Sequence, residues 1–309
     1  MKQANEQANI HALVSMLDES DPELYQGIKN ALFALGDEAL PYLQDAMDLK
    51  ATPLWQNRIE GLIRELRLET ACKHLGEWKK EENPDLMQGF YFLSSAFYPD
   101  LKWESVRDLF NQLYGDCWLL LASQDNLQQN VVLLNNFFFN TCKFKIGKKI
   151  TDGYSFADFF LPKLINLRQG NDRSLSLAYQ YLAQRNKIPI FQLNLPVVNI
   201  LACTTAMDHC SKADIVFCLD ITQRGAMVRR ADVEPILSEQ KQIQVCNTVE
   251  SLQDYAKLLY LMASMNETDP FRKQAVKKIH QSLGESANSI NIFGKGNPFA
   301  GNEPDSGMM

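Results

Sequence analysis

Apolar residues recur at helical spacing through the first part of the chain, and this pattern predicts a run of amphipathic helices. Residues 9–17 place four apolar side chains on one helical face: Ile10, Leu13, Val14 and Leu17. A second helix is predicted to start after Asp21, because aspartate caps a helix N-terminus and Pro22 suits the first helical position. Gly36 is expected to end it.

Two further helices are expected in the N-terminal part, one opening at Asp37 and one over residues 55–68. The pattern L-x-x-L-G-x-x-A-x-P-x-L that joins the second and third helices is similar to HEAT repeats, which stack helix pairs into a solenoid. One clear unit is present, whereas a solenoid needs about three. We therefore expect a HEAT-like helical cap packed on the next domain, and a generic helical bundle is the alternative.

The middle of the chain changes from helices to an alternation of helix and strand. Residues 86–122 are expected to be helical with a break at 98–101, and the apolar stretch 126–140, which contains three successive phenylalanines, is expected to be a buried helix. After Gly170, a helix capped by Asn171 or Asp172 is followed by segments rich in valine and isoleucine. These predict strands over 190–195, 197–204, 213–221 and 226–228.

A final helix pair is predicted over residues 250–265 and 269–283. The last residues are rich in glycine, asparagine, serine and proline, a composition typical of disorder. We therefore expect an α+β protein in four parts: a helical cap (1–70), an α+β core (71–248), a C-terminal helix pair (249–283) and a disordered tail (284–309).

Charge and hydropathy exclude several classes of protein. The net charge of -6 and the pI near 5.4 argue against a nucleic-acid-binding surface. Apolar runs such as 118–122 and 131–134 fall far short of the roughly 20 residues that span a bilayer. The polar start of the chain has no apolar segment of the kind found in signal peptides. We expect a cytoplasmic protein without a membrane partner.

The seven cysteines are odd in number and scattered, which favours reduced, buried thiols over a disulfide framework. Cys203, His209, Cys210 and Cys218 lie near one another in sequence. Their spacing lacks the C-x2–4-C pairs of structural zinc sites. We expect no metal and no cofactor.

A series of residues in order then carries a resemblance to a known family: Arg168, Gly170, Asn171, Ser174, Leu175, Tyr179 or Tyr181, Ala183, Pro189, Leu195 and Pro196, then Phe217, Leu219, Asp220 and Gly225. In this pattern the chain resembles the SirB-type transglutaminase-like proteins. The resemblance extends over most of residues 9–283, and it implies a papain-like α+β core in which a helix start and two strands present a nucleophile, a base and an orienting acid.

The departures from that pattern bear on function. Asp172 stands where catalytic members of the superfamily carry a cysteine, and Val198 stands where the family pattern has histidine, so neither a thiolate nor a general base is available there. Only the acid, Asp220, is kept. We interpret Asp172, Ser174, Val198 and Asp220 as a degenerate pocket with no catalytic residue.

Two classes of function follow from this interpretation. The first is a pseudoenzyme that binds a protein or peptide as a module or scaffold, with Tyr179, Tyr181, Arg185 and Lys187 as its nearest candidate surface. The second is an amide hydrolase or acyltransferase with a non-standard nucleophile, either Ser174 or Cys203, paired with His209. Loss of activity on a single point change would distinguish the enzyme from the binding module.

Overall fold

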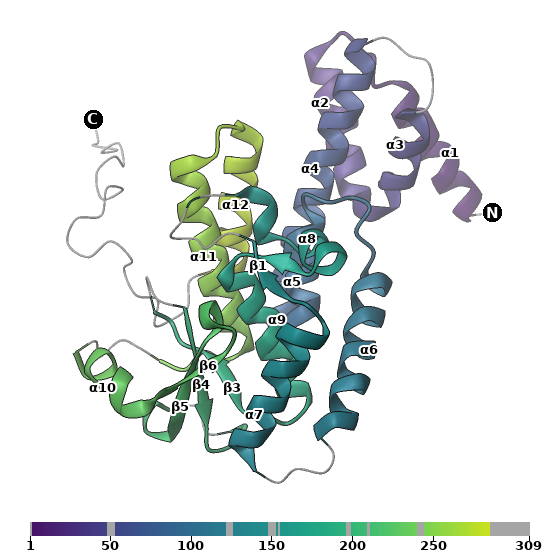
Figure 1. Cartoon of the computed structure of the whole chain (residues 1–309). Coiled ribbons are helices and arrows are strands. Elements are labelled where there is room, and N and C mark those ends of the chain that lie inside the picture. The colour runs from purple at the N-terminus through teal and green to yellow at the C-terminus, as the bar shows by residue number, and fades with distance from the viewer. Residues whose placement is uncertain are drawn as a thin grey trace, which may run out of the picture.

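The computed structural model describes residues 2–47, 53–121, 126–147, 153, 155–195, 199–208, 211–239 and 244–284. It confirms the predicted fold class, with a helical N-terminal part, a mixed α/β middle and a C-terminal helix pair (Figure 1). The expected tail (284–309) lies outside the described residues except for Gly284.

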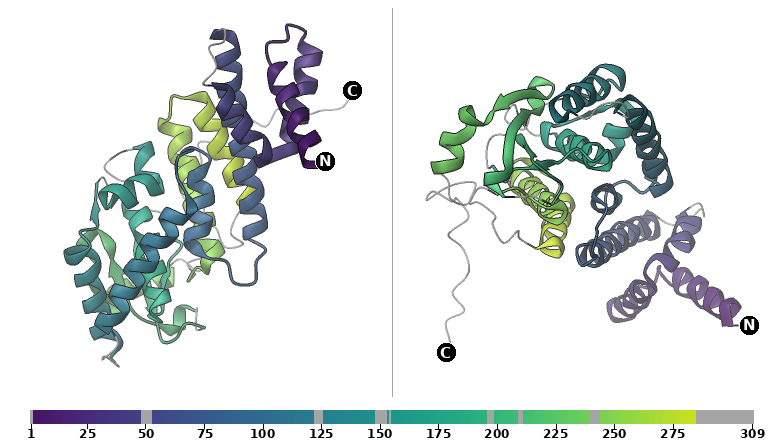
Figure 2. Two further views of the ribbon diagram at one scale, coloured as in Figure 1. Left: turned by 90° about the vertical axis from the view of Figure 1, so that its right-hand side faces the viewer. Right: turned by 90° about the horizontal axis from the view of Figure 1, so that it is seen from below.

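The N-terminal part consists of α1 (Lys2–Ser15), α2 (Pro22–Leu35), the 3-10 turn η1 (Gly36–Ala39), α3 (Leu40–Met47) and α4 (Pro53–Trp78). Asp21 caps α2 as predicted, since its side chain accepts hydrogen bonds from the backbone N–H groups of Glu23 and Leu24. The third helix begins three residues later than expected because η1 intervenes. Figures 1 and 2 show α1–α3 gathered around one end of α4, beside the rest of the molecule.

Helix α4 is longer than predicted and joins two hydrophobic cores. Ile59 and Leu62 belong to the N-terminal core, whereas Leu75 and Trp78 belong to the main core. The last turns of α4 pack on α5 (Leu86–Ser95) and α12 (Pro270–Leu283). The expected boundary between the helical cap and the core therefore falls inside a continuous helix.

The main core is built around α9 (Asp172–Arg185), which packs against α5, α6 (Trp103–Leu121) and the sheet. The apolar segment after residue 126 is helical as predicted, with α7 (Leu127–Asn135) ending in the π-helical turn η2 (Asn136–Thr141). All three of its phenylalanines are buried. A two-stranded parallel pair, β1 (Lys145–Ile146) and β2 (Gln169–Gly170), and the short helices η4 (Phe156–Phe159) and α8 (Leu161–Leu167) lead into α9.

The four-stranded antiparallel sheet has the order β3–β4–β5–β6, with strands β3 (Ile190–Gln192), β4 (Ile200–Thr204), β5 (Ile215–Asp220) and β6 (Ala226–Arg229). Alternation along β4 sends Leu201 and Cys203 into the main core, while Ile200 and Ala202 join a smaller core on the other face. The sheet thus has one face on the main core and one under α10 (Arg230–Glu239).

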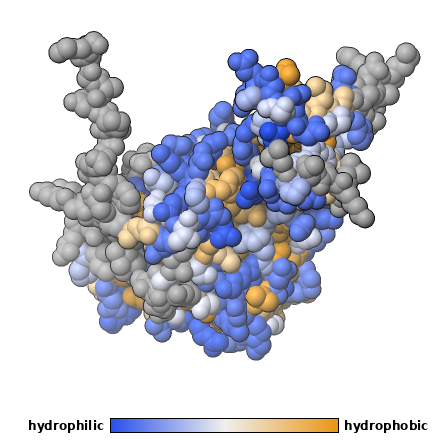
Figure 3. Space-filling model, turned by 90° about the horizontal axis from the view of Figure 1, so that it is seen from above, coloured by the Kyte–Doolittle hydropathy of each residue, from blue (hydrophilic) through white to orange (hydrophobic). Residues whose placement is uncertain are grey.

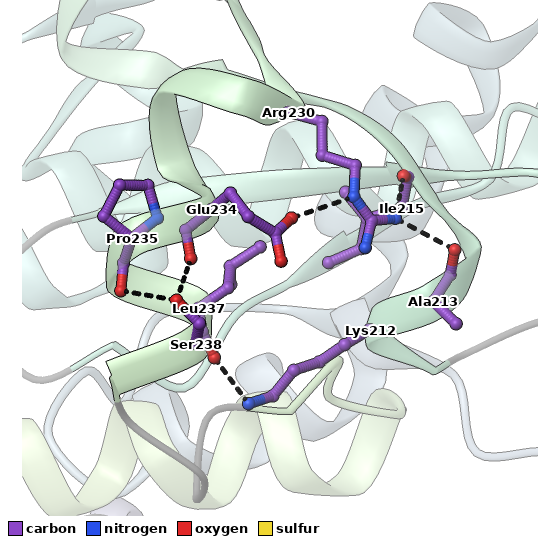
Figure 4. Close-up of polar contacts among 8 residues, drawn as sticks. All are labelled: Lys212, Ala213, Ile215, Arg230, Glu234, Pro235, Leu237 and Ser238. Atoms are coloured by element: carbon purple, nitrogen blue, oxygen red, sulfur yellow. Dashed lines mark hydrogen bonds and ion pairs between the residues drawn. The ribbon is translucent and has the colours of Figure 1, made fainter.

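Polar contacts hold α10 to the turn before β5 and to the start of that strand (Figure 4). The Arg230 guanidinium donates to the carbonyl oxygens of Ala213 and Ile215 and forms an ion pair with Glu234 one turn later. Lys212, in the 3-10 turn η5 (Lys212–Asp214), donates to the carbonyl oxygen of Leu237 near the other end of the helix. The short turn η6 (Ile221–Gln223) connects β5 to β6.

The chain ends its described part with an antiparallel pair, α11 (Thr248–Asn266) and α12, whose positions confirm the predicted helix pair. Asn247 caps α11 with a capping box to Glu250, and Asp269 caps α12 before Pro270. Helix α11 packs on α5, and α12 packs on α4.

On the face shown in Figure 3, hydrophilic side chains predominate and hydrophobic ones form small separate patches. Among the residues that the structure describes, no helix has the length and apolar character needed to cross a bilayer.

Candidate functional site

The start of α9 is a tight, buried turn in which the side chains of Asn171 and Ser174 bond to the backbone. Asn171 is the cap residue, and its side chain accepts a 2.7 Å hydrogen bond from the N–H of Ser174. The hydroxyl of Ser174 has the carbonyl oxygens of Asp158 and Asn171 as acceptors, each at 3.1 Å, and the side chain is fully buried. A Cβ on Gly170 would lie 2.2 Å from the Ser174 hydroxyl oxygen, so this turn requires glycine. The Ser174 hydroxyl is therefore engaged by backbone carbonyl oxygens.

Asp172 occupies the first turn of α9, at the position where the resemblance implies a nucleophile. It is 8% exposed, and its backbone carbonyl accepts hydrogen bonds from Ser176 Oγ and from Asn199 Nδ2. Val198, expected to face it, lies outside the described residues, as does His209. The described histidines lie on α1, α4 and α12.

Asn199, just before β4, is the polar residue that reaches α9 from the sheet, and the sequence reasoning missed it. Its Nδ2 donates to the Asp172 carbonyl and to Ser176 Oγ, both at 2.7 Å, and its Oδ1 accepts from Gln192 Nε2 at 3.1 Å. The family pattern aligns Val198 with the base, and it gives no functional role to the neighbouring Asn199. A buried asparagine in an otherwise apolar strand was the available signal.

Gln180 extends the same network through the core. Its Oε1 accepts from the backbone N–H of Gln192 at 3.2 Å, and its Nε2 donates to Ser251 Oγ at 3.3 Å. Gln180, Gln192, Asn199, Ser176 and Ser251 are all buried, so a continuous set of polar side chains joins α9, the sheet and α11.

Asp220 ends β5 as predicted, and its carboxylate serves the next turn. Its Oδ1 accepts from the backbone N–H of Thr222 at 2.8 Å and from the Thr222 hydroxyl at 2.6 Å, which caps η6. Strand pairing places Asp220 opposite Ile200, the residue after Asn199. The structure thus gives Asp220 a local structural role in a strand beside the network.

The cysteine proposed as an alternative nucleophile is inaccessible. Cys203 is fully buried, and burial raises the pKa of its thiol to about 12; burial likewise raises the pKa of Cys218 to about 11. Reactivity depends on the thiolate form. Neither side chain is suited to nucleophilic attack at neutral pH. All six cysteines among the described residues are free thiols.

The prediction of a surface patch formed by Tyr179, Tyr181, Arg185 and Lys187 is wrong for the two tyrosines, whereas Arg185 is partly exposed and Lys187 is exposed. Tyr179 is fully buried and donates its hydroxyl proton to Asn135, and Tyr181 is buried against Phe110 while its hydroxyl contacts Asp85. Arg185 stacks over Tyr114. Helix α9 packs against α5, α6 and β3, so most of its side chains, including both tyrosines, are buried.

A pocket does lie beside the start of α9, between that helix, β3 with the residues after it, and α11. It holds about 500 Å³ of empty space including its open mouth, and the centre of a water molecule can occupy about 40 Å³ of it. Gln192 and Ser251, two members of the network, line the buried part. Arg173, Asp254 and Lys257 are partly exposed and form its rim.

A thiol and a carboxyl interact beside this rim. Cys246, which is 2% exposed, donates to Asp254 Oδ2 at 3.5 Å. Burial raises the pKa of the Asp254 carboxyl to about 6, and the positive charges of Lys257 and Arg173 oppose this rise. Burial also raises the pKa of the Cys246 thiol well above its ordinary value. Cys246 therefore remains a protonated donor at neutral pH. Among the described residues, no group of three histidine, cysteine or acidic side chains is arranged to hold a metal.

Residues 104–262 match the family described as the transglutaminase-like superfamily. The chain belongs to the transglutaminase-like superfamily. The matched segment runs from α6 to α11 and includes α9, the sheet and every residue of the pocket, whereas α1–α5 and α12 lie outside it. No curated protein and no solved structure matches the chain.

Proposed function

We propose that this transglutaminase-like protein is a non-catalytic, SirB-type member that binds a protein or peptide as a module or scaffold. The single observation that carries the proposal is the start of α9, where the resemblance implies a nucleophile and the chain has the buried Asp172. Ser174, two residues later, has its hydroxyl engaged by backbone carbonyls. A nucleophile must be accessible and must have a base within reach.

Among the described residues, the Asn199 carboxamide approaches this helix start from the side of the sheet, and an amide neither accepts nor releases a proton near neutral pH. Asp220, the retained acid, caps a turn. These assignments support a scaffold in which former catalytic positions have become structural. The HEAT-like helical cap predicted from the sequence adds a surface of the kind that solenoids use for binding.

Catalysis is tested by incubating the full chain with a mixture of acyl-peptides and measuring cleavage or acyl transfer by mass spectrometry. We expect no product above a blank without protein. Product that disappears in Ser174→Ala, Cys203→Ser or His209→Ala would overturn the proposal and establish the amide hydrolase or acyltransferase instead.

Binding is tested by selecting peptides from a random displayed library on the full chain and measuring the affinity of the selected sequences. We expect Asp172→Asn and Asp220→Asn to bind the selected peptides as the wild type does, because neither side chain is assigned to recognition. Failure to enrich any sequence, with the folded state confirmed by circular dichroism, would count against a peptide-binding module.

A further inference from the structure

An open groove lies outside the family-matched segment, where the helical cap meets the main core. Its walls come from η1 and α3, from the face of α4 that includes Arg67 and His74, and from α5 with its connection to α6. The centres of water molecules can occupy about 400 Å³ of it, within the range of about 300–1,000 Å³ found for ligand sites. An adjoining hollow of about 340 Å³ shares Tyr98, Pro99 and Leu101 with the groove and continues toward α8. The two together suit an extended segment.

Aromatic rings line the middle of this groove. Tyr91, Phe92 and Trp103 are each partly exposed, and the centroid of the Tyr91 ring lies 5.6 Å from that of Trp103 and 5.7 Å from that of Phe92. Aromatic faces attract cations within about 6 Å of the ring centroid, most often arginine. Among the described residues, no arginine or lysine lies over any of these three rings. The rings are therefore available to a cation from outside the chain.

Two carboxylates lie near the Tyr91 hydroxyl. Burial raises the pKa of Tyr91, and the negative charges of Glu104 and Asp37 raise it further. Both acidic residues are exposed, and within the described part of the chain neither is paired with an arginine or a lysine. Asp37 Oδ2 lies 3.8 Å from His74 Nε2, which makes an ion pair only when the imidazole is protonated.

The basic residues close to the groove do not offset these two acids. Burial lowers the pKa of Arg67 and the charge of Asp100 opposes this, so the charges of these two residues offset each other. Lys102 belongs to the adjoining hollow. Arg272, whose charge acts on the Tyr98 hydroxyl, already forms ion pairs with two carboxylates of its own helix start.

The groove and the hollow thus have three acidic residues (Asp37, Asp100 and Glu104) and two basic ones (Arg67 and Lys102), a net charge of about -1. The two acids without a basic partner are both at the aromatic end. The charge and the exposed rings therefore favour the same kind of ligand group there, a cation that has a flat face.

We propose that this groove binds an extended, arginine-containing segment of a partner protein, with the guanidinium against the rings of Tyr91 and Trp103. Asp37 and Glu104 supply the opposite charge, and apolar residues beside the arginine pack on Leu40. Arginine suits the site better than lysine, because its planar, weakly hydrated group stacks on aromatic faces and binds a carboxylate with two hydrogen bonds. The inference rests on the proposed function, since it names the partner's chemistry and the place where the partner binds.

The test titrates blocked peptides into the full chain with isotope-labelled tryptophan and follows the indole N–H signals by NMR. The probe is acetyl-Ala-Leu-Arg-Leu-Ala-amide, and its control has citrulline, a neutral group of the same shape, in place of the arginine. We expect the Trp103 signal, identified with Trp103→Phe, to shift saturably, and that of Trp118, exposed near the far end of α6, to stay unchanged.

The citrulline peptide should bind about 10-fold more weakly than the arginine peptide, because it loses both the cation–π attraction and the charge-assisted hydrogen bonds. Equal affinities of the two peptides, or no shift of the Trp103 signal up to about 10 mM of the arginine peptide, would overturn the inference.

Three variants locate the binding. Asp37→Asn and Glu104→Gln should each weaken the arginine peptide by about 3-fold and leave the citrulline peptide unchanged. Asp116→Asn, at an exposed position further along α6 and outside the groove, should change neither. All three side chains are exposed, so the variants should fold, and thermal unfolding checks this. Arginine-peptide binding that is unchanged in both groove variants would overturn the inference.

Three other results would assign the groove to a different occupant, and each would overturn the inference. N-acetyl-argininamide that binds as tightly as the arginine peptide would indicate a free small cation. Displacement of the probe by a synthetic peptide of residues 285–309 would indicate the end of this chain. A Trp103 signal that shifts with protein concentration alone would indicate a second copy.

Two further measurements separate the possible failures. Mass spectrometry of the recovered probe shows whether an amide bond was cleaved, which would overturn the non-catalytic proposal while leaving the groove's ligand intact. Library peptides that lack arginine and leave the Trp103 signal unchanged would overturn the groove assignment while leaving peptide binding intact.

Discussion

The Asn135 side chain lies against the backbone of Gly225, 90 positions further along the chain, and donates a 2.7 Å hydrogen bond from Nδ2 to its carbonyl oxygen. The Oδ1 atom of the same amide accepts from the Tyr179 hydroxyl at 2.7 Å. A helix end, the central helix α9 and the turn before β6 are thereby joined by one side chain. Gly225 has a φ of 76°, a backbone conformation that favours glycine.

Gly225→Ala should destabilise the protein by about 3 kcal/mol, because alanine resists positive φ and its Cβ would disrupt a buried hydrogen bond. That Cβ would lie 2.0 Å from Asn135 Oδ1. The free energy of unfolding from urea titration measures the effect. Gly61→Ala, at a helical position in α4 with nothing within 4 Å, is the control and should be neutral or stabilising by up to about 1 kcal/mol. Similar effects of the two changes would refute the role given to the Asn135–Gly225 contact.

Asn199→Asp should cost about 3 kcal/mol, since a carboxylate oxygen would replace the Nδ2 donor that faces the Asp172 carbonyl. Urea titration again gives the value. Asn30→Asp is the matched control, because Asn30 is exposed on α2 and uses only its Oδ1, which aspartate keeps, to accept from Gln26. We expect that control to stay within about 0.5 kcal/mol of the wild type. A well-tolerated aspartate at position 199 would mean that the buried network does not hold α9 to the sheet.

Asp254 should make stability fall as pH rises from about 4 to about 6. Burial raises its pKa to about 6, Glu250 adds to the rise, and Cys246, Lys257 and Arg173 oppose it. Within that interval the folded state keeps a proton that the unfolded state has released, so the unfolding free energy decreases with pH. The neutral Asp254→Asn should therefore be more stable than the wild type by about 1 to 2 kcal/mol at pH 7.5 and equal to it near pH 4.

Urea titrations across this range test the prediction, with Asp45→Asn at an exposed position on α3 as the control expected to change little. An Asp254→Asn variant that is less stable than the wild type at pH 7.5 would contradict it, and would indicate that the carboxylate is stabilised by its cationic neighbours more than it is destabilised by burial.

Cys203 and Cys218 should be alkylated by iodoacetamide at least about 100-fold more slowly in the folded protein than in guanidinium chloride, because both are buried and their thiolate fractions are small. Peptide mapping by mass spectrometry resolves each site, and the unfolded chain serves as the reference for each. A Cys203 that reacts as fast folded as unfolded would revive it as a candidate nucleophile.

Local signals made the helical parts of the fold predictable. Asp21 with Pro22, Gly36, and Asp269 with Pro270 mark helix ends through their own side chains and backbones, so no tertiary information was needed. The end of α4 was missed, because no cap or breaker follows Leu68 and the apolar pattern there serves two different cores.

The site was less accessible to sequence reasoning. Period-two alternation predicts from the sequence that Asn199 and Leu201 share one face of a strand. It does not predict which of these residues contacts the start of α9, because that depends on how the strand lies across the helix. The same limit explains Tyr181 and Arg185, whose spacing suggested a solvated face. Burial of a whole helix is decided by elements distant in sequence, as the contacts of α9 with α5, α6 and β3 illustrate.

Helix α4 is about 39 Å long at the usual rise per residue. It passes from one hydrophobic core to the other with helical residues throughout. A partner long enough to touch α1–α3 and also enter the pocket would therefore meet two sites at a fixed separation. Binding at the second site would not have to restrict a hinge motion between the two parts of the protein, so it would carry no entropic cost of that kind. The partner's affinity would depend on the effective concentration that its own length sets at the second site. A partner shortened by a few residues could no longer reach both sites, so the added affinity of two-site binding would be lost abruptly.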